Sequence, residues 1–195
     1  MKTLSPKLNR IGVLFVFMVI IKLTSCSNST SHQPATGEGF TAIENELKSK
    51  FGDNAYYTDL KVVYIKDIGN TISTTVTKAP ESLNMEEWNL SQNTWTQHSE
   101  VTLEVPEGTQ AADYMFQLSD KINLTKLGGL VEESITKLKS EKNINNLILS
   151  MAFIKFPKNG DSSKTEYAIN LVPESDGTSF SFYYTLDGEL IKMDY

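Results

Sequence analysis

Hydrophobic positions in the first half of the chain change from a helical period to a strand period. Four apolar residues recur at three- and four-residue steps, which predicts an amphipathic helix; they are Phe40, Ile43, Leu47 and Phe51. Thr41 and Glu44 fit a capping box at its start. From residue 60 to 105 apolar and polar positions mostly alternate, which predicts four strands. The last of these strands is expected to place four apolar residues on one face, Trp95, Val101, Leu103 and Val105.

The second half of the chain repeats this order. Residues 109–123 fit a strand and a helix equally well, and both assignments stay open. A second apolar stripe predicts a helix that ends near Asn143; its members are Leu127, Leu130, Val131, Ile135 and Leu138. An apolar run at 147–156 and further alternating segments follow, and Asp187-Gly188 is a strong hairpin signal. The pattern again indicates one helix and four strands.

We therefore predict an α+β fold of two successive helix-plus-antiparallel-meander units, each a helix packed on a four-stranded sheet, as in cystatin-like folds. A helix across one face of a meander buries the apolar surfaces of both. The hairpin that starts at Trp88 aligns with the hairpin that starts at Tyr183, which favours a duplicated unit. The predicted units span residues 40–105 and 125–195, joined by a connector at 106–124.

The first 25 residues have the features of an export signal. Lys2, Lys7 and Arg10 precede an uninterrupted apolar run at 11–21, and small residues follow it. This order is typical of a secretory signal peptide. The run is shorter than the roughly 20 apolar residues that a membrane-spanning helix needs. We expect residues 1–25 to be removed.

Leu23-Thr24-Ser25-Cys26 resembles the lipobox of bacterial lipoproteins. The resemblance implies cleavage before Cys26, a diacylglyceryl group on its thiol and a fatty acyl chain such as palmitate on its amine. Two or more such chains anchor a protein stably, which makes the membrane an expected partner. Residues 26–39 are small and polar and predict a flexible tether. Ser27 stands where an inner-membrane retention signal has aspartate, so we expect a lipid-anchored location on the outer membrane, facing the periplasm.

Charge and cysteine content exclude one class of partner and one kind of covalent bond. The net charge of −6 becomes more negative without residues 1–25, which hold basic but no acidic residues. Arg10 is the only arginine, so the mature part lacks the side chain that best recognises phosphate and guanine. We therefore expect no nucleic-acid partner. Cys26 is the only cysteine, which excludes an intramolecular disulfide.

The second helix and the meander after it, which ends in FYYTLDGELIKMDY at residues 182–195, resemble the PepSY-like family of exported bacterial proteins. In that family the last hairpin has an aromatic-rich strand, an Asp-Gly turn and a strand with aliphatic residues. The resemblance covers residues 125–195 best. It implies a protein that binds or inhibits partners such as proteases, and it supplies no catalytic residue.

No residue pattern predicts catalysis or metal binding. His32 and His98 are the only histidines, and a metal site needs several converging ligands. The nucleophile-elbow pattern G-x-S-x-G, a calcium loop and a Gly-rich phosphate loop are all missing from the sequence. We therefore expect no catalytic residue, no metal and no cofactor.

Three aromatic residues are the candidates for binding. Trp88 and Trp95 form either an exposed pair that grips a sugar or peptide or, as we favour, part of the core against the first helix. Tyr183 lies on the opposite strand face from Phe182 and Tyr184 and is the better candidate for exposure. The leading hypothesis is a membrane-anchored, non-enzymatic module that binds an envelope protein or peptide. One version of this hypothesis is that binding inhibits the partner. The alternatives are an envelope carrier of a small apolar or sugar ligand and, third, an enzyme.

Overall fold

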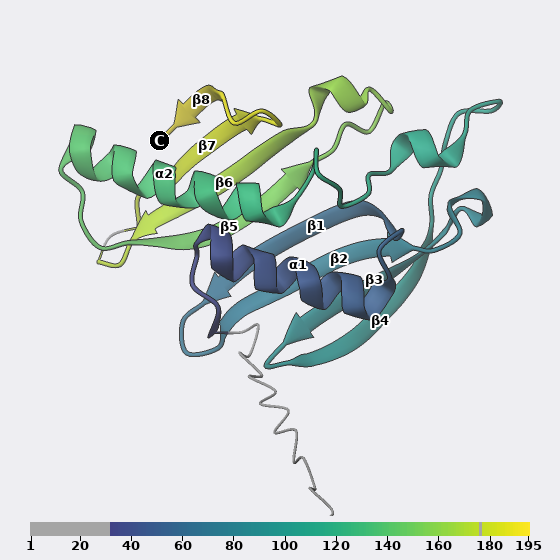
Figure 1. The fold of residues 1–195 in the computed structure, drawn as a ribbon, viewed down its shortest axis with the longest axis horizontal. Helices are drawn as coiled ribbons and strands as arrows, with labels where there is room; N and C mark the ends of the chain where they lie inside the picture. The colour runs from purple at the N-terminus through teal and green to yellow at the C-terminus, as the bar shows by residue number, and fades with distance from the viewer. Residues whose placement is uncertain (1–31, 176) are drawn as a thin grey trace, which may run out of the picture.

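Eight antiparallel strands form one sheet, and two helices lie side by side on one of its faces (Figure 1). The computed structural model describes residues 32–175 and 177–195. The strand order is β4-β3-β2-β1-β5-β6-β7-β8. The predicted α+β class is confirmed. The helices and strands are α1 (Gly37–Phe51), β1 (Tyr56–Ile65), β2 (Gly69–Thr77), β3 (Asn84–Ser91), β4 (Thr94–Thr102), α2 (Leu124–Lys142), β5 (Leu147–Lys155), β6 (Glu166–Pro173), β7 (Phe180–Thr185) and β8 (Leu190–Asp194).

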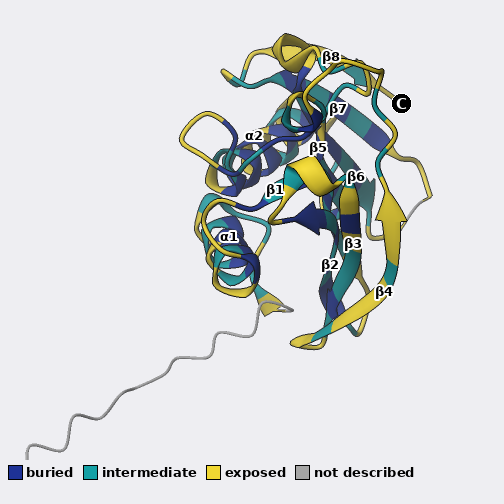
Figure 2. Cartoon of the chain, turned by 90° about the vertical axis from the view of Figure 1, so that its right-hand side faces the viewer, coloured by how far each residue is buried: buried dark blue, intermediate teal, exposed yellow. Residues whose placement is uncertain are grey.

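The two runs of four strands meet at the centre of the sheet. β1 pairs with β5 through Lys61 opposite Phe153 and Val63 opposite Met151. The larger of two buried hydrophobic clusters in the described part of the chain has residues of both halves and lies between the helices and the sheet. In Figure 2 the buried positions lie where the helices face the strands, whereas the edge strand β4 is largely exposed. Among the described residues, no α-helix covers the opposite face of the sheet (Figure 1).

Helix α1 starts earlier than its apolar stripe suggests. Its N-cap is Thr36, whose hydroxyl accepts a hydrogen bond from the Gly39 amide at 3.2 Å. The predicted capping box of Thr41 and Glu44 is therefore wrong. Glu44 instead accepts hydrogen bonds from the Leu124 amide at 2.7 Å and the Lys48 amine at 2.6 Å, so it joins α1 to the start of α2.

The last part of the predicted tether belongs to the fold. Within residues 26–39, helix α1 already begins at Gly37, and Ala35 packs against the core. The amide of Asn70 donates a hydrogen bond to the carbonyl oxygen of Gln33 at 2.8 Å, which fixes the chain beside β2. The signal peptide and Cys26 lie outside the described residues.

Helix α2 packs closely against the start of α1. The helix ends at Asn143, as predicted; Asn143 adopts the left-handed conformation, and Asn123 caps the first turn. A side chain on Gly128 would collide with the carbonyl oxygen of Thr36, whereas one on Gly129 would meet no atom within 4 Å. Gly128 thus allows the two helices to approach, because only a residue without Cβ fits there.

The ambiguous segment at 109–123 forms neither a strand nor an α-helix. It contains a short 3-10 helix, Ala111–Tyr114, and a single bridge between Phe116 and Tyr57. Met115, Phe116 and Leu118 are buried. The alternating and helical patterns overlap here because the segment buries side chains from an irregular backbone.

A bulge in β4 changes the faces that the sequence predicts. Trp88 pairs with Gln97 but Glu87 pairs with Ser99, so His98 is an extra residue. The extra residue shifts every later side chain to the other face. Val101 therefore lies opposite Met85, on the other face from Trp95, and is 38% exposed. The prediction that Trp95 and Val101 share a face is wrong.

Candidate functional site

Trp88 and Trp95 both contact the ring of Phe51, the last residue of α1. The centroid of the Phe51 ring is 5.9 Å from that of Trp88 and 5.0 Å from that of Trp95, both edge to face. The turn at Gln92 and Asn93 brings the two strands together, with φ values of 47° and 61° that are typical of a tight hairpin. Both tryptophans are partly buried and pack against the core.

Hydrogen bonds hold both indole rings in place. The Trp95 indole N–H donates to Glu46 Oε1 on α1 at 2.8 Å, and the Trp88 indole N–H donates to Glu86 Oε2 at 2.7 Å. The amine of Lys50 lies 4.2 Å from the centroid of the Trp88 ring, a cation–π arrangement. Trp88 thus presents a fixed aromatic surface, with a positive charge over the ring and a negative charge at its N–H group.

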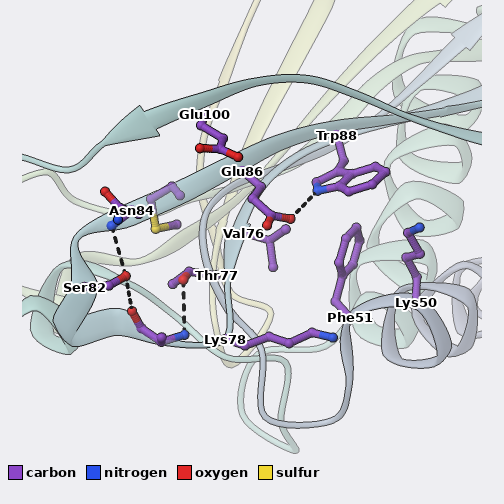
Figure 3. Close-up of a pocket in the computed structure, with 12 residues that line it drawn as sticks. Lys50, Phe51, Val76, Thr77, Lys78, Ser82, Asn84, Glu86, Trp88 and Glu100 are labelled. Atoms are coloured by element: carbon purple, nitrogen blue, oxygen red, sulfur yellow. Dashed lines mark hydrogen bonds between the residues drawn. The ribbon is translucent and has the colours of Figure 1, made fainter.

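A groove of about 460 Å³ opens beside Trp88, where α1 ends and no longer covers the sheet (Figure 3). Phe51, Val76 and Trp88 form its apolar part. Lys78 reaches toward Phe51 from the chain after β2 (Figure 3). We call this hollow the Trp88 groove.

Two glutamates occupy paired strand positions in the Trp88 groove. Glu86 on β3 pairs directly with Glu100 on β4, and both line the hollow. Glu100 reaches this face because the bulge at His98 reverses the orientation of the end of β4. Like charges at directly opposed positions destabilise a sheet. A positive group near both glutamates would relieve such repulsion.

Tyr183 lies on the other face of the sheet from the tryptophans. Its neighbours Phe182 and Tyr184 are buried in the core, whereas Tyr183 is partly exposed on the open face. The amines of Lys155 and Lys192 lie 5.4 Å and 4.5 Å from its ring centroid. The structure therefore joins Trp88 and Trp95 in one cluster and leaves Tyr183 apart. The hairpin alignment of Trp88 with Tyr183 matches residues from opposite faces.

The histidines do not gather with other metal ligands. His98 lies at the β4 bulge on the open face, and His32 lies where the described chain begins. In residues 32–175 and 177–195 no group of three His, Cys, Asp or Glu side chains could hold a metal ion. Of the described helices, none is long and apolar enough to cross a membrane.

A buried polar cluster at the start of α2 is absent from the sequence predictions. Around Glu44 lie Tyr57 and Tyr167, and the Tyr167 hydroxyl bonds to both backbone groups of Asn123. Burial raises the pKa of both tyrosines, and the Glu44 charge raises it further. These residues come from α1, β1, β6 and the start of α2, and only the tertiary fold brings them together, so periodicity offers no signal for the cluster. Its hydrogen bonds fix α2 and give it a structural role.

Comparisons with known proteins give few matches. No family model matches the chain, and no curated protein matches it. Among solved structures, the crystal structure of a candidate lipoprotein (CD1622) from Clostridium difficile 630 is similar. It is 15% identical, with a TM-score of 0.48 over 80% of this chain and 91% of that chain. At this level of likeness, nothing about the function of this chain follows from it.

Proposed function

We propose that the chain is a lipoprotein of the bacterial cell envelope that binds a protein or peptide without catalysing a reaction. Lipid on Cys26 holds it on the outer membrane, facing the periplasm. The Leu23-Thr24-Ser25-Cys26 motif and the basic and apolar segments before it support the anchor.

The Trp88 groove is the observation that carries the binding role. Rigid aromatic side chains with satisfied polar atoms give large contact areas at a small cost in side-chain entropy, and tryptophan is common among the residues that dominate binding energies. Trp88 is fixed by Glu86 and by Lys50, and it borders a hollow that is open to solvent (Figure 3). An open groove suits a segment of polypeptide better than a small ligand enclosed by the fold.

The charges in the groove suggest the type of segment. Glu86 and Glu100 lie at paired positions and would be bridged by a lysine or arginine of the ligand. Phe51 and Trp88 would contact an adjacent apolar side chain. A peptide with a basic residue beside an apolar one therefore fits the groove.

The order of elements supports a duplicated, PepSY-like origin of the fold. α1 precedes β1–β4 and α2 precedes β5–β8, and each run of four strands is contiguous in the sheet. In this proposal the groove belongs to the first unit, at the end of α1, and the second unit completes the core.

Site-specific photo-crosslinking in intact cells of the native host tests the binding role. A photoreactive residue at Lys78, in the groove, should give a discrete adduct with one partner. The adduct should disappear with Trp88→Ala and persist with Tyr183→Ala, because Tyr183 lies on the other face. A photoreactive residue at Lys192, beside Tyr183, is the matched control and should give no such adduct. A missing Lys78 adduct, or one that survives Trp88→Ala in a folded protein, would count against the proposal.

A further inference from the structure

The chain enters the fold at a fixed place beside the β1–β2 turn. Asn70, at the start of β2, is 4% exposed and donates its side-chain N–H to the carbonyl oxygen of Gln33. Ala35 then packs on the core before α1 begins. The point where the chain leaves the folded body is therefore held next to the β1–β2 turn.

Covalent geometry limits how far this point lies from Cys26. Six residue steps separate Cys26 from His32, and at most about 3.6 Å per step gives a reach of roughly 20 Å. On the proposed function, the acyl chains on Cys26 lie in the bilayer. The β1–β2 end of the folded body then stays within about 20 Å of the membrane surface.

The surface around this point has the chemistry of a membrane interface. Tyr64 and Ile65, at the end of β1, are 40% and 41% exposed, and Lys66 follows them in the turn. Next to them is an open groove of about 600 Å³ whose lining includes Ala35, Ile135 and residues 147–149. Tyrosine with aliphatic and basic neighbours is typical of residues that lie at the level of lipid headgroups.

We propose that this end of the molecule, residues 32–35 and 64–68, is a membrane-contact surface that rests on the lipid bilayer. Tyr64 and Ile65 enter the headgroup region, and Lys66 meets lipid phosphate groups. We call these residues the anchor pole. The occupant is the bilayer itself, because the lipid-bearing cysteine lies only a few residues before the anchor pole.

This orientation holds the Trp88 groove away from the membrane. β2 runs from Gly69 at the anchor pole to Thr77, which lines the groove. Its eight residue steps correspond to about 26 Å of extended chain. The sheet thus acts as a spacer, with the groove open toward the aqueous compartment.

The test uses Cys26, the only thiol in the chain. The isotope-labelled mature chain, residues 26–195, is coupled through Cys26 to maleimide lipid in phosphatidylcholine nanodiscs that contain a gadolinium-chelating lipid. Amide signals near the bilayer broaden in NMR spectra. We expect strong broadening for residues 64–68 and for Gln33, and little for Ser82 and Trp88. Nanodiscs without gadolinium give the reference intensities.

Two matched variants separate surface contact from mere tethering. Ile65→Asp places a charge on the anchor pole, whereas Ile191→Asp changes a similarly exposed isoleucine on β8, near the opposite end of the strands. Ile65→Asp should weaken the broadening of residues 64–68 relative to that of Gln33, which the tether keeps close to the bilayer in every variant, and Ile191→Asp should leave this ratio unchanged. Even broadening over all faces, broadening centred on β8, or a ratio that Ile65→Asp leaves unchanged would each overturn the proposal. Because the coupling is chemical, this result is independent of lipidation in cells and of ligand binding at Trp88.

Discussion

Replacing Tyr57 by Phe is expected to stabilise the protein, whereas the same change at Tyr167 is expected to destabilise it. The two side chains are equally buried, at 1% and 0% exposure. No described residue offers a hydrogen-bond partner to the Tyr57 hydroxyl. The Tyr167 hydroxyl donates to the Asn123 carbonyl oxygen at 3.1 Å and accepts from the Asn123 amide at 3.0 Å. The two substitutions therefore remove the same hydroxyl group, in one case without a hydrogen-bond partner and in the other with two hydrogen bonds.

The magnitudes follow from the cost of an unsatisfied polar group. A buried hydroxyl without a partner costs about 1–3 kcal/mol. Phenylalanine keeps the ring and its packing, so Tyr57→Phe should raise the free energy of unfolding by about 1 kcal/mol. Tyr167→Phe deprives both backbone groups of Asn123, the N-cap of α2, of this partner and should lower it by about 2 kcal/mol. For a domain of this size, 1 kcal/mol shifts the Tm by roughly 2–4 °C.

Urea unfolding of the wild type and the two variants, followed by tryptophan fluorescence, measures both effects. The dependence of the free energy on urea should be unchanged, so that the midpoints report stability directly. A Tyr57→Phe variant that is destabilised as much as Tyr167→Phe would refute the reasoning, because the Tyr57 hydroxyl would then contribute favourably to the fold.

Three further predictions concern helix packing and pH. Gly128→Ala should lower the Tm, because the new methyl group meets the Thr36 carbonyl oxygen. Gly129→Ala should instead raise the free energy of unfolding by about 1 kcal/mol, because alanine favours a helix more than glycine does. Thermal unfolding of both variants checks this, and equal effects would contradict it. Glu44→Ala should cost about 2 kcal/mol in urea unfolding, because the Leu124 amide loses its charged acceptor. The exposed ion-pair variant Glu141→Ala should cost less than about 0.5 kcal/mol, and comparable losses would refute the structural role of Glu44. Burial raises the pKa of Tyr167 and Tyr184 above the ordinary value of 10.0. The stability that these neutral tyrosines contribute should therefore be fully present below about pH 10 and be lost as the pH rises through the raised pKa values. A Tm that stays constant above pH 10 would contradict this.

The local features of the fold could be predicted from the sequence. The stripe that ends in Phe51 and the stripe that ends in Leu138 both became helices, because a three- to four-residue period depends only on neighbours along the chain. The turns at Gln92 and Asp187 were also predictable, since tight hairpins have their own sequence signature.

Features that depend on a residue far away in the sequence could not be predicted. The pairing of β1 with β5 joins residues far apart in sequence and leaves no periodic signal. Glu44 fits a capping box in its own helix, yet its acceptor role depends on Leu124, 80 positions away. His98 looks like any alternating strand residue, and only the observed register with β3 reveals the bulge.

The same limit applied to the candidate site. The sequence indicated that Trp88 and Trp95 belong together, and the structure joins them through Phe51. Unbroken alternation would place Glu100 on the other face of the sheet from Trp95, and only the bulge brings it opposite Glu86 in the Trp88 groove. The acidic part of the groove was therefore invisible to a pattern that assumes unbroken alternation.

The proposed location, the anchor pole and the orientation of the groove all depend on lipidation of Cys26. Metabolic labelling of the native host with a clickable fatty acid, followed by isolation of the wild type and of Cys26→Ala, tests it most directly. We predict that the wild type carries the label and partitions with the membrane, and that Cys26→Ala carries none. Equal labelling of the two proteins, or an unlabelled wild type, would contradict the account.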